Sequence, residues 1–102
     1  MSYSVEVVKD EKVWYGCSNG CWHFMLDEIV EALSPEHKPA IQRLHEYSHA
    51  GGRLRWYEAK RIAAALATVK GGVGIFSNAQ DIAALARVFE VAAETKSSVQ
   101  VC

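Results

Sequence analysis

The chain has 102 residues, of which 50% are hydrophobic and 23% are charged, with a formal net charge of -1. This length suits one globular domain over residues 1–102. The near-neutral charge excludes a general attraction to nucleic acid or to an anionic membrane. No apolar run approaches the roughly 18 residues of a membrane span, and residues 1–12 lack the apolar core of a signal peptide. The three cysteines, an odd number, are typical of free thiols in a reducing compartment. We therefore expect a cytoplasmic protein without a membrane partner.

The two ends of the chain carry the clearest strand patterns. Residues 3–8 alternate and are rich in β-branched side chains, which predicts a strand. A charged turn over residues 9–12 leads to a short second strand at residues 13–15. Residues 98–101 predict a last strand, and we expect it to pair with the first.

Helical periodicity predicts four helices between these strands. The first has an apolar stripe of Trp22, Met25, Leu26, Ile29 and Leu33 and an exposed face with Asp27, Glu28 and Glu31. Their limits are set by Pro39, by a Gly51-Gly52 pair and by Ser77 or Asn78 as the cap of the fourth helix, where Ser77 with Gln80 fits a capping box. The expected helices cover residues 21–33, 39–49, 54–69 and 77–94, with a flexible break at residues 71–74. The sequence thus predicts an α+β fold, with about four helices packed on a small antiparallel sheet formed by the N- and C-terminal strands.

His45-Glu46-Tyr47-Ser48-His49 has the H-E-x-x-H spacing of zinc peptidases, and Gly52 follows where a longer form of the motif has glycine. Histidines at i and i+4 lie on one face of a helix and can reach one metal ion. Glu46 would then deprotonate a metal-bound water. This pattern gives one alternative function, a zinc-dependent hydrolase with Glu46 as catalytic residue and with His45, His49 and Glu58 as metal ligands.

The third ligand is the weak point of the hydrolase hypothesis. The longer motif supplies it from the position that Arg55 occupies, and a guanidinium cannot bind metal. Glu58 is the only near substitute, and the motif helix ends almost at once, at Gly51. A structural role explains the same residues, with His45 partly buried and His49 favoured by the dipole at the end of its helix. We therefore expect no cofactor, no metal site and no catalytic residue.

Cys17 and Cys21, together with His23, form another candidate group. Their C-x-x-x-C spacing departs from the C-x-x-C of zinc sites, and the second ligand pair would have to be His45 and His49. Cys21 at the start of a helix could instead act as a nucleophile with a lowered pKa. Buried thiols that behave as small apolar side chains are the more common outcome.

One short segment combines basic and aromatic residues: Arg53, Arg55, Trp56, Tyr57, Lys60 and Arg61. Such a segment can hold a phosphate backbone and stack on bases, which gives a second alternative, a small nucleic-acid-binding protein. The acidic balance elsewhere favours an ordinary solvated helix face. Tryptophan, tyrosine and arginine are also common anchors of protein interfaces. We therefore predict a protein partner with an acidic surface, bound by residues 16–22 and by Arg53, Arg55, Trp56, Tyr57 and Arg61.

Several segments carry a resemblance to known proteins. The run Tyr15-Gly16-Cys17-Ser18-Asn19-Gly20-Cys21-Trp22, then Gly51-Gly52, then Trp56 leading into Ala59, Ala63 and Leu66, resembles small uncharacterised bacterial and phage proteins. Leu54-Arg55-Trp56 followed by Ala63-Ala64-Ala65-Leu66 is similar to part of a small anti-CRISPR protein that blocks a nuclease by binding it. The resemblance implies a cytoplasmic protein-binding module of a phage or mobile element, an anti-CRISPR-like or immunity-type inhibitor that occupies a partner's surface. It assigns no functional residue.

Overall fold

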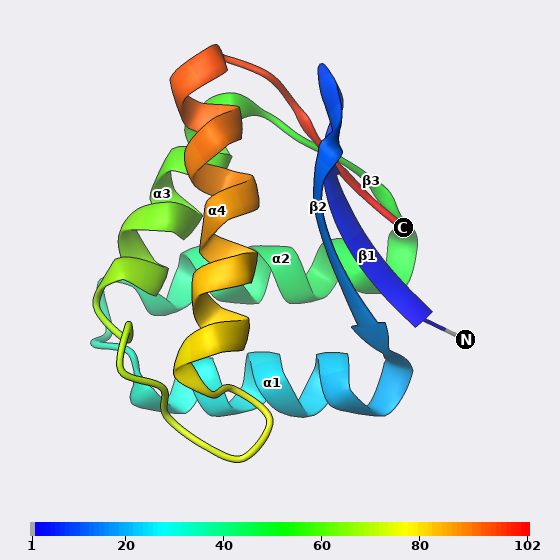
Figure 1. The fold of residues 1–102 in the computed structure, drawn as a ribbon. Helices are drawn as coiled ribbons and strands as arrows, with labels where there is room; N and C mark the ends of the chain where they lie inside the picture. The colour runs from blue at the N-terminus through cyan, green and yellow to red at the C-terminus, as the bar shows by residue number, and fades with distance from the viewer. Residues whose placement is uncertain (1) are drawn as a thin grey trace.

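The computed structural model describes residues 2–102 (Figure 1), with the side chains of Ser2, Glu11, Asn19, His49 and Ala50 outside that description. Within these residues the chain forms four helices and one four-stranded antiparallel sheet of order β2-β1-β4-β3. The predicted α+β fold is confirmed. The elements are β1 (Ser2–Val7), β2 (Asp10–Ser18), α1 (Asn19–Ala32), α2 (Lys38–Ala50), β3 (Gly52–Leu54), α3 (Trp56–Ala67), α4 (Ala79–Thr95) and β4 (Val99–Val101).

The two ends of the chain meet in the sheet, as the sequence predicts. In the antiparallel register of β1 and β4, Val5 lies opposite Val101 and Val7 lies opposite Val99. All four valines are at most 1% exposed, because they point to the face of the sheet that the helices cover (Figure 1). β4 is therefore an inner strand of the sheet and not an edge.

The sheet is larger than the sequence predicts. β2 begins at Asp10, inside the predicted charged turn, because its pairing with β1 continues toward the hairpin. β3 was not predicted at all. It follows a backbone reversal at Gly51 and Gly52, whose φ angles of 71° and 131° favour glycine, and it pairs with the far side of β4.

The four helices lie close to their predicted limits. The predicted stripe of α1 is buried in full: Trp22, Met25, Leu26, Ile29 and Leu33. The cap of α4 is Asn78, whose Oδ1 accepts a hydrogen bond from the backbone N–H of Asp81 at 2.9 Å. Asn78 and Asp81 therefore form this cap in place of the predicted Ser77 and Gln80. No helix in residues 2–102 combines the length and the apolar character needed to cross a membrane.

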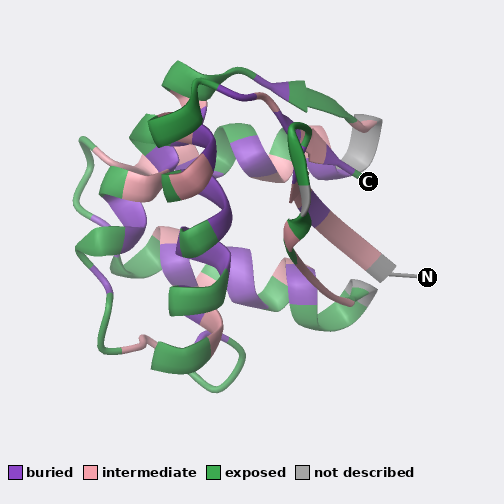
Figure 2. Ribbon diagram, turned by 45° about the horizontal axis from the view of Figure 1, so that its top comes forward, coloured by how far each residue is buried: buried purple, intermediate pink, exposed green. Residues whose placement is uncertain are grey.

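Buried residues of all four helices and of β1, β3 and β4 form one core, and they are coloured purple in Figure 2. One polar chain crosses this core. The indole N–H of Trp22 donates to Ser48 Oγ at 2.7 Å, and Ser48 donates in turn to the carbonyl of Leu44 at 2.9 Å. Both polar groups have partners, so burying them between α1 and α2 leaves no hydrogen bond unmade.

The segment between α3 and α4 forms a closed loop. Gly72, with a φ angle of 88°, forms a β-bridge with Asn78, and the N–H of Val73 donates to the carbonyl of Ser77 at 2.9 Å. The sequence predicts a helix stop and a flexible break here. The stop is confirmed, but hydrogen bonds close the loop instead of leaving it open as a hinge.

Candidate functional site: two exposed aromatic surfaces

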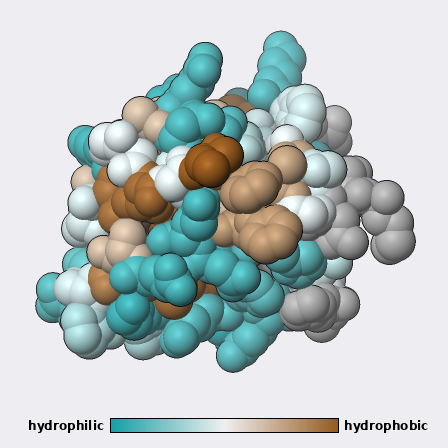
Figure 3. Space-filling view, turned by 90° about the horizontal axis from the view of Figure 1, so that it is seen from below, coloured by the Kyte–Doolittle hydropathy of each residue, from teal (hydrophilic) through white to brown (hydrophobic). Residues whose placement is uncertain are grey.

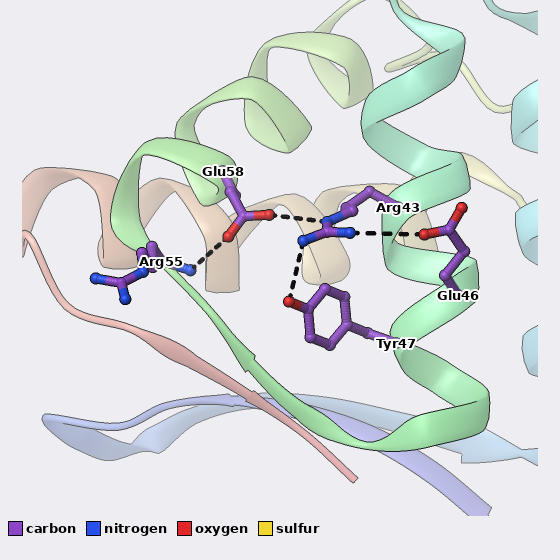
Figure 4. Close-up of polar contacts among 5 residues, drawn as sticks. All are labelled: Arg43, Glu46, Tyr47, Arg55 and Glu58. Carbon is purple, nitrogen blue, oxygen red and sulfur yellow. Dashed lines mark hydrogen bonds and ion pairs between the residues drawn. The ribbon is translucent and has the colours of Figure 1, made fainter.

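Glu46 and Glu58, two residues of the hydrolase hypothesis, both face Arg43 (Figure 4). Arg43 Nε donates to Glu58 Oε2 at 3.1 Å, and Arg43 Nη1 lies 3.7 Å from Glu46 Oε2. A further nitrogen of the guanidinium donates to the hydroxyl of Tyr47 at 3.2 Å. The hydrogen bond to Glu58 raises the pKa of Arg43 above its usual range. A guanidinium thus stands between the two carboxylates.

His45 lies on another side of α2, because successive residues of a helix point about 100° apart. Its Nε2 is 3.6 Å from Asp27 Oδ1, and its ring centre is 5.2 Å from that of His23. The side chain of His49 lies outside the described residues. Among the side chains that are described, no three histidine, cysteine or acidic groups gather in a metal-binding arrangement. The geometry therefore separates His45 from Glu46 and Glu58.

The cysteines are free thiols in different surroundings. Cys17 is partly buried on β2, and burial raises the pKa of its thiol. Burial also raises the pKa of the neighbouring Tyr15, whose hydroxyl lies 3.7 Å from Met25 Sδ. Cys21 and Cys102 are exposed. The direction of the shift at Cys17 is opposite to the one that activates a nucleophilic thiol.

The structure divides the predicted partner-binding residues among different surfaces. Arg53 lies on β3, and its Nε donates to Gln100 Oε1 at 3.0 Å on the outward face of the sheet. The strand registers align Arg53, Gln100, Glu6 and Trp14 in one row across that face. Trp14 is 62% exposed at the end of this row. Arg53 therefore belongs to the open face of the sheet.

Arg55, Trp56 and Tyr57 remain together at the start of α3. The backbone N–H of Arg55 donates to Glu58 Oε1 at 3.2 Å, a one-sided cap, because an arginine side chain cannot accept a hydrogen bond. The rings of Trp56 and Tyr57 meet edge to face with centres 5.9 Å apart. Lys96, after α4, places its Nζ 5.7 Å from the centre of the Trp56 ring. We call Arg55, Trp56, Tyr57 and Lys96 the basic corner.

Arg61 is turned away from Trp56, although it lies one turn after Tyr57 on α3. It lies five residues after Trp56, which rotates it by about 140° around the helix axis. Arg61 lines a groove of about 560 Å³ between α2 and α3, together with His37, Arg43 and Glu58. The structure therefore does not bring Arg61 and Trp56 to one surface.

A second aromatic surface was not predicted. Phe24 of α1 is 56% exposed, and Ile75 and Phe76 of the closed loop are 87% and 37% exposed. The rings of Phe24 and Phe76 stack with centres 5.0 Å apart. Hydrophobic side chains gather on this face of the molecule (Figure 3). We call Phe24, Ile75 and Phe76 the apolar patch. The sequence indicates this patch in one way: Phe24 lies outside the apolar stripe of α1, on the face predicted to be exposed to solvent.

Glu28 attaches the loop of the apolar patch to α1. Its Oε1 accepts a hydrogen bond from the N–H of Phe76 at 2.9 Å and another from Ser77 Oγ at 2.8 Å. Ser77 is fully buried. A Cβ atom at Gly74 would overlap the Glu28 carboxylate, so glycine at this position lets the loop approach the helix.

Comparison with known proteins adds no family to these observations, since no protein-family model, curated protein or solved structure matches the chain. The resemblance to phage and anti-CRISPR proteins therefore stays a prediction.

Proposed function

We propose that the protein is a protein-binding module that occupies an acidic surface of its partner through the basic corner. The observation that carries this proposal is the exposed Trp56–Tyr57 pair beside two cations. Trp56 is 36% exposed and Tyr57 is 47% exposed. Large aromatic side chains and arginine are the usual anchors of protein interfaces, and their edge-to-face contact holds the two rings in one arrangement.

The charges around the basic corner favour an acidic partner. Arg55, Lys96 and, one turn along α3, Lys60 are exposed cations. The acidic side chains nearest in sequence are Glu58 and Glu94. Glu58 is only 18% exposed and is already bound to Arg43 and to the N–H of Arg55. The positive charges therefore remain available to steer an acidic surface toward the aromatic pair.

The hydrolase alternative has no comparable support. Glu46 and Glu58 meet Arg43, whereas His45 meets Asp27 on another side of α2. A water held near Glu46 would have a guanidinium beside it in place of a second ligand. We therefore do not propose a metal-dependent reaction.

The form of binding that we propose is inhibition, by an anti-CRISPR-like or immunity-type protein of a phage or mobile element. This form follows from the sequence resemblance. A cytoplasmic location is part of the same proposal, and the three free thiols are compatible with it.

The test begins with a pull-down from a native lysate and continues as a binding titration against the partner it finds. Combined Arg55→Glu and Lys96→Glu should weaken binding by about tenfold or more, with a weaker salt dependence. Tyr57→Ala should also weaken binding. The matched control is Arg87→Glu, an exposed cation on the middle of α4. Arg61→Glu tests how far the contact extends along α3, because Arg61 lies one turn after Tyr57 and lines the α2–α3 groove.

Other results would contradict the proposal. If Glu46→Ala abolishes activity while the basic-corner variants act normally, the hydrolase hypothesis is correct. One zinc per chain, lost on His49→Ala, would support it further. Salt-sensitive retention on nucleic acid that the Arg55 and Lys96 variants abolish would instead favour a nucleic-acid partner.

A further inference from the structure

The apolar patch leaves three large side chains, Phe24, Ile75 and Phe76, partly in water at one place. Single exposed apolar residues are ordinary, whereas adjacent ones on a folded surface mark sites of interaction. Ile75 is the most exposed large hydrophobic residue in the described part of the chain, at 87%. It is next to Phe76, whose ring stacks on Phe24 from α1. The patch thus joins two segments far apart in the sequence.

The apolar patch is fixed before any partner binds. Glu28 holds the loop through the N–H of Phe76 and the hydroxyl of Ser77, and the Val73–Ser77 hydrogen bond closes the loop on itself. A surface fixed in this way loses little conformational entropy on binding, so the burial of its apolar atoms contributes more to affinity.

Acidic side chains border the apolar patch along α1. Asp27 and Glu31 lie three and seven residues after Phe24, on the same exposed face of the helix. They also line an open groove of about 540 Å³ between α1 and α2, with the remaining lining supplied by Val30, Gln42, His45 and Glu46. The patch and the groove therefore form one continuous surface, with apolar groups at one side and carboxylates at the other.

The cations around this groove already have partners, some of which line the groove itself. Arg43 pairs with Glu46 and Glu58, and Lys38 Nζ donates to the carbonyl of Val30 at 2.7 Å. His45 faces Asp27, and this contact is an ion pair only when the imidazole is protonated. No ion pair to Glu31 occurs among the described side chains. The charge of Glu31 thus remains available to a partner, as does that of Asp27 while His45 is neutral.

We propose that this surface is a second binding site, which takes a basic amphipathic helical segment of another protein. Apolar side chains of that segment would cover Phe24, Ile75 and Phe76. Its lysine or arginine side chains would lie over Asp27 and Glu31. Because Phe24 and Glu31 are seven residues apart, about 10 Å along α1, the anchors and the cations of the ligand should be about two helical turns apart. This surface is distinct from the basic corner and has the opposite charge.

The proposal is tested with synthetic helical peptides of about 18 residues, five helical turns, followed by amide chemical shifts of the full chain. One peptide carries leucine and phenylalanine at i, i+3, i+4 and i+7 with lysine elsewhere. A second replaces every lysine with glutamate, and a third scrambles the basic sequence so that it has no apolar face. The basic amphipathic peptide should shift the amides of residues 24–31 and 73–77, and the other two should bind at least about tenfold more weakly.

Substitutions in the apolar patch and in the groove show which residues contribute to the affinity for the peptide. Ile75→Ser should weaken peptide binding by about tenfold with little effect on folding, because Ile75 is so exposed. Combined Asp27→Lys and Glu31→Lys should weaken binding by about fivefold and reduce its salt dependence. Matched controls are Val8→Ser, an exposed apolar residue of the hairpin, and Glu90→Lys on α4, and neither should change the affinity.

Three results would overturn the proposal. The first is equal binding of the acidic or scrambled peptide. The second is binding that Ile75→Ser leaves unchanged. The third is self-association of the protein alone, seen by light scattering and removed by Ile75→Ser. In that case the occupant would be the basic corner of a second copy, which has the same combination of aromatic and basic groups.

Discussion

The basic corner and the apolar patch are built alike, and each depends on one glutamate. Glu58 accepts hydrogen bonds from the N–H of Arg55 and from Arg43. Glu28 accepts hydrogen bonds from the N–H of Phe76 and the hydroxyl of Ser77. Each surface also contains one pair of aromatic rings in direct contact.

The two glutamates differ in how far their partners lie along the chain. Glu58 reaches Arg55 within one helical turn and Arg43 across 15 residues. Glu28 reaches partners 48 and 49 residues away. The aromatic pair of the basic corner is therefore a local product of the start of α3. The apolar patch requires the finished tertiary structure.

The largest effect should come from a change that removes both surfaces. Deleting residues 98–102 removes β4, an inner strand, together with the buried Val99 and Val101. Each buried valine contributes about 1.5–3 kcal/mol and each ladder hydrogen bond about 1 kcal/mol. We expect unfolding or a severe loss of stability by circular dichroism. Gln100→Thr, which keeps the strand, is the control, and an unchanged melting temperature after deletion would rule out a structural role for β4.

The next effect separates the two surfaces. Glu28→Ala should lower the free energy of unfolding by about 2 kcal/mol, because it leaves the buried Ser77 hydroxyl without its acceptor. Glu58→Ala should cost about 1 kcal/mol, since it removes a one-sided cap and an ion pair to a half-exposed arginine. Urea unfolding measures both. Glu28→Gln, whose amide oxygen can still accept, should recover most of the loss. A larger cost for Glu58→Ala would contradict this comparison.

The smallest effect is a difference in thiol reactivity. Cys21 and Cys102 are exposed and should be alkylated first, whereas Cys17 should react slowly at neutral pH because partial burial raises its pKa and lowers its thiolate fraction. Mass spectrometry after timed alkylation measures the order, and denatured protein should take three labels. Cys21 lies three residues before Phe24 on α1, so the basic peptide should protect Cys21 and leave Cys102 reactive. Equal protection of both would argue against binding at the apolar patch.

Local sequence patterns predicted most of the fold. The α1 stripe from Trp22 to Leu33 was predicted because its spacing follows the helical period. The pairing of the chain ends was predicted because residues 3–8 and 98–101 are the clearest β-type runs. β3 was not predicted, because a strand of three residues is too short to show the alternating pattern of apolar and polar side chains. The predicted turn at residues 9–12 was too long, because pairing with β1 extends β2 despite its charges.

The candidate site was predicted only where its residues are neighbours in the chain. Arg55, Trp56 and Tyr57 lie together because they are consecutive. Arg61 is separated from Trp56 by the rotation of α3, which the helical period alone would have indicated, but it lies one turn after Tyr57. Arg53 lies on a strand that was not predicted, so its place on the sheet face required the structure.

The sequence by itself determined the α+β class, the helices and the clustering of Arg55, Trp56 and Tyr57, because each depends on residues close in the chain. Only the tertiary structure decided that Phe24 meets Phe76 and that Glu28 holds the loop between them. Contacts across about 50 residues leave no periodic pattern in the sequence. They arise when the fold brings the loop before α4 onto α1. The helical period of α2 turns Glu46 toward Arg43, and the packing of α2 on α1 places His45 beside Asp27, so an apparent metal motif forms part of two separate surfaces.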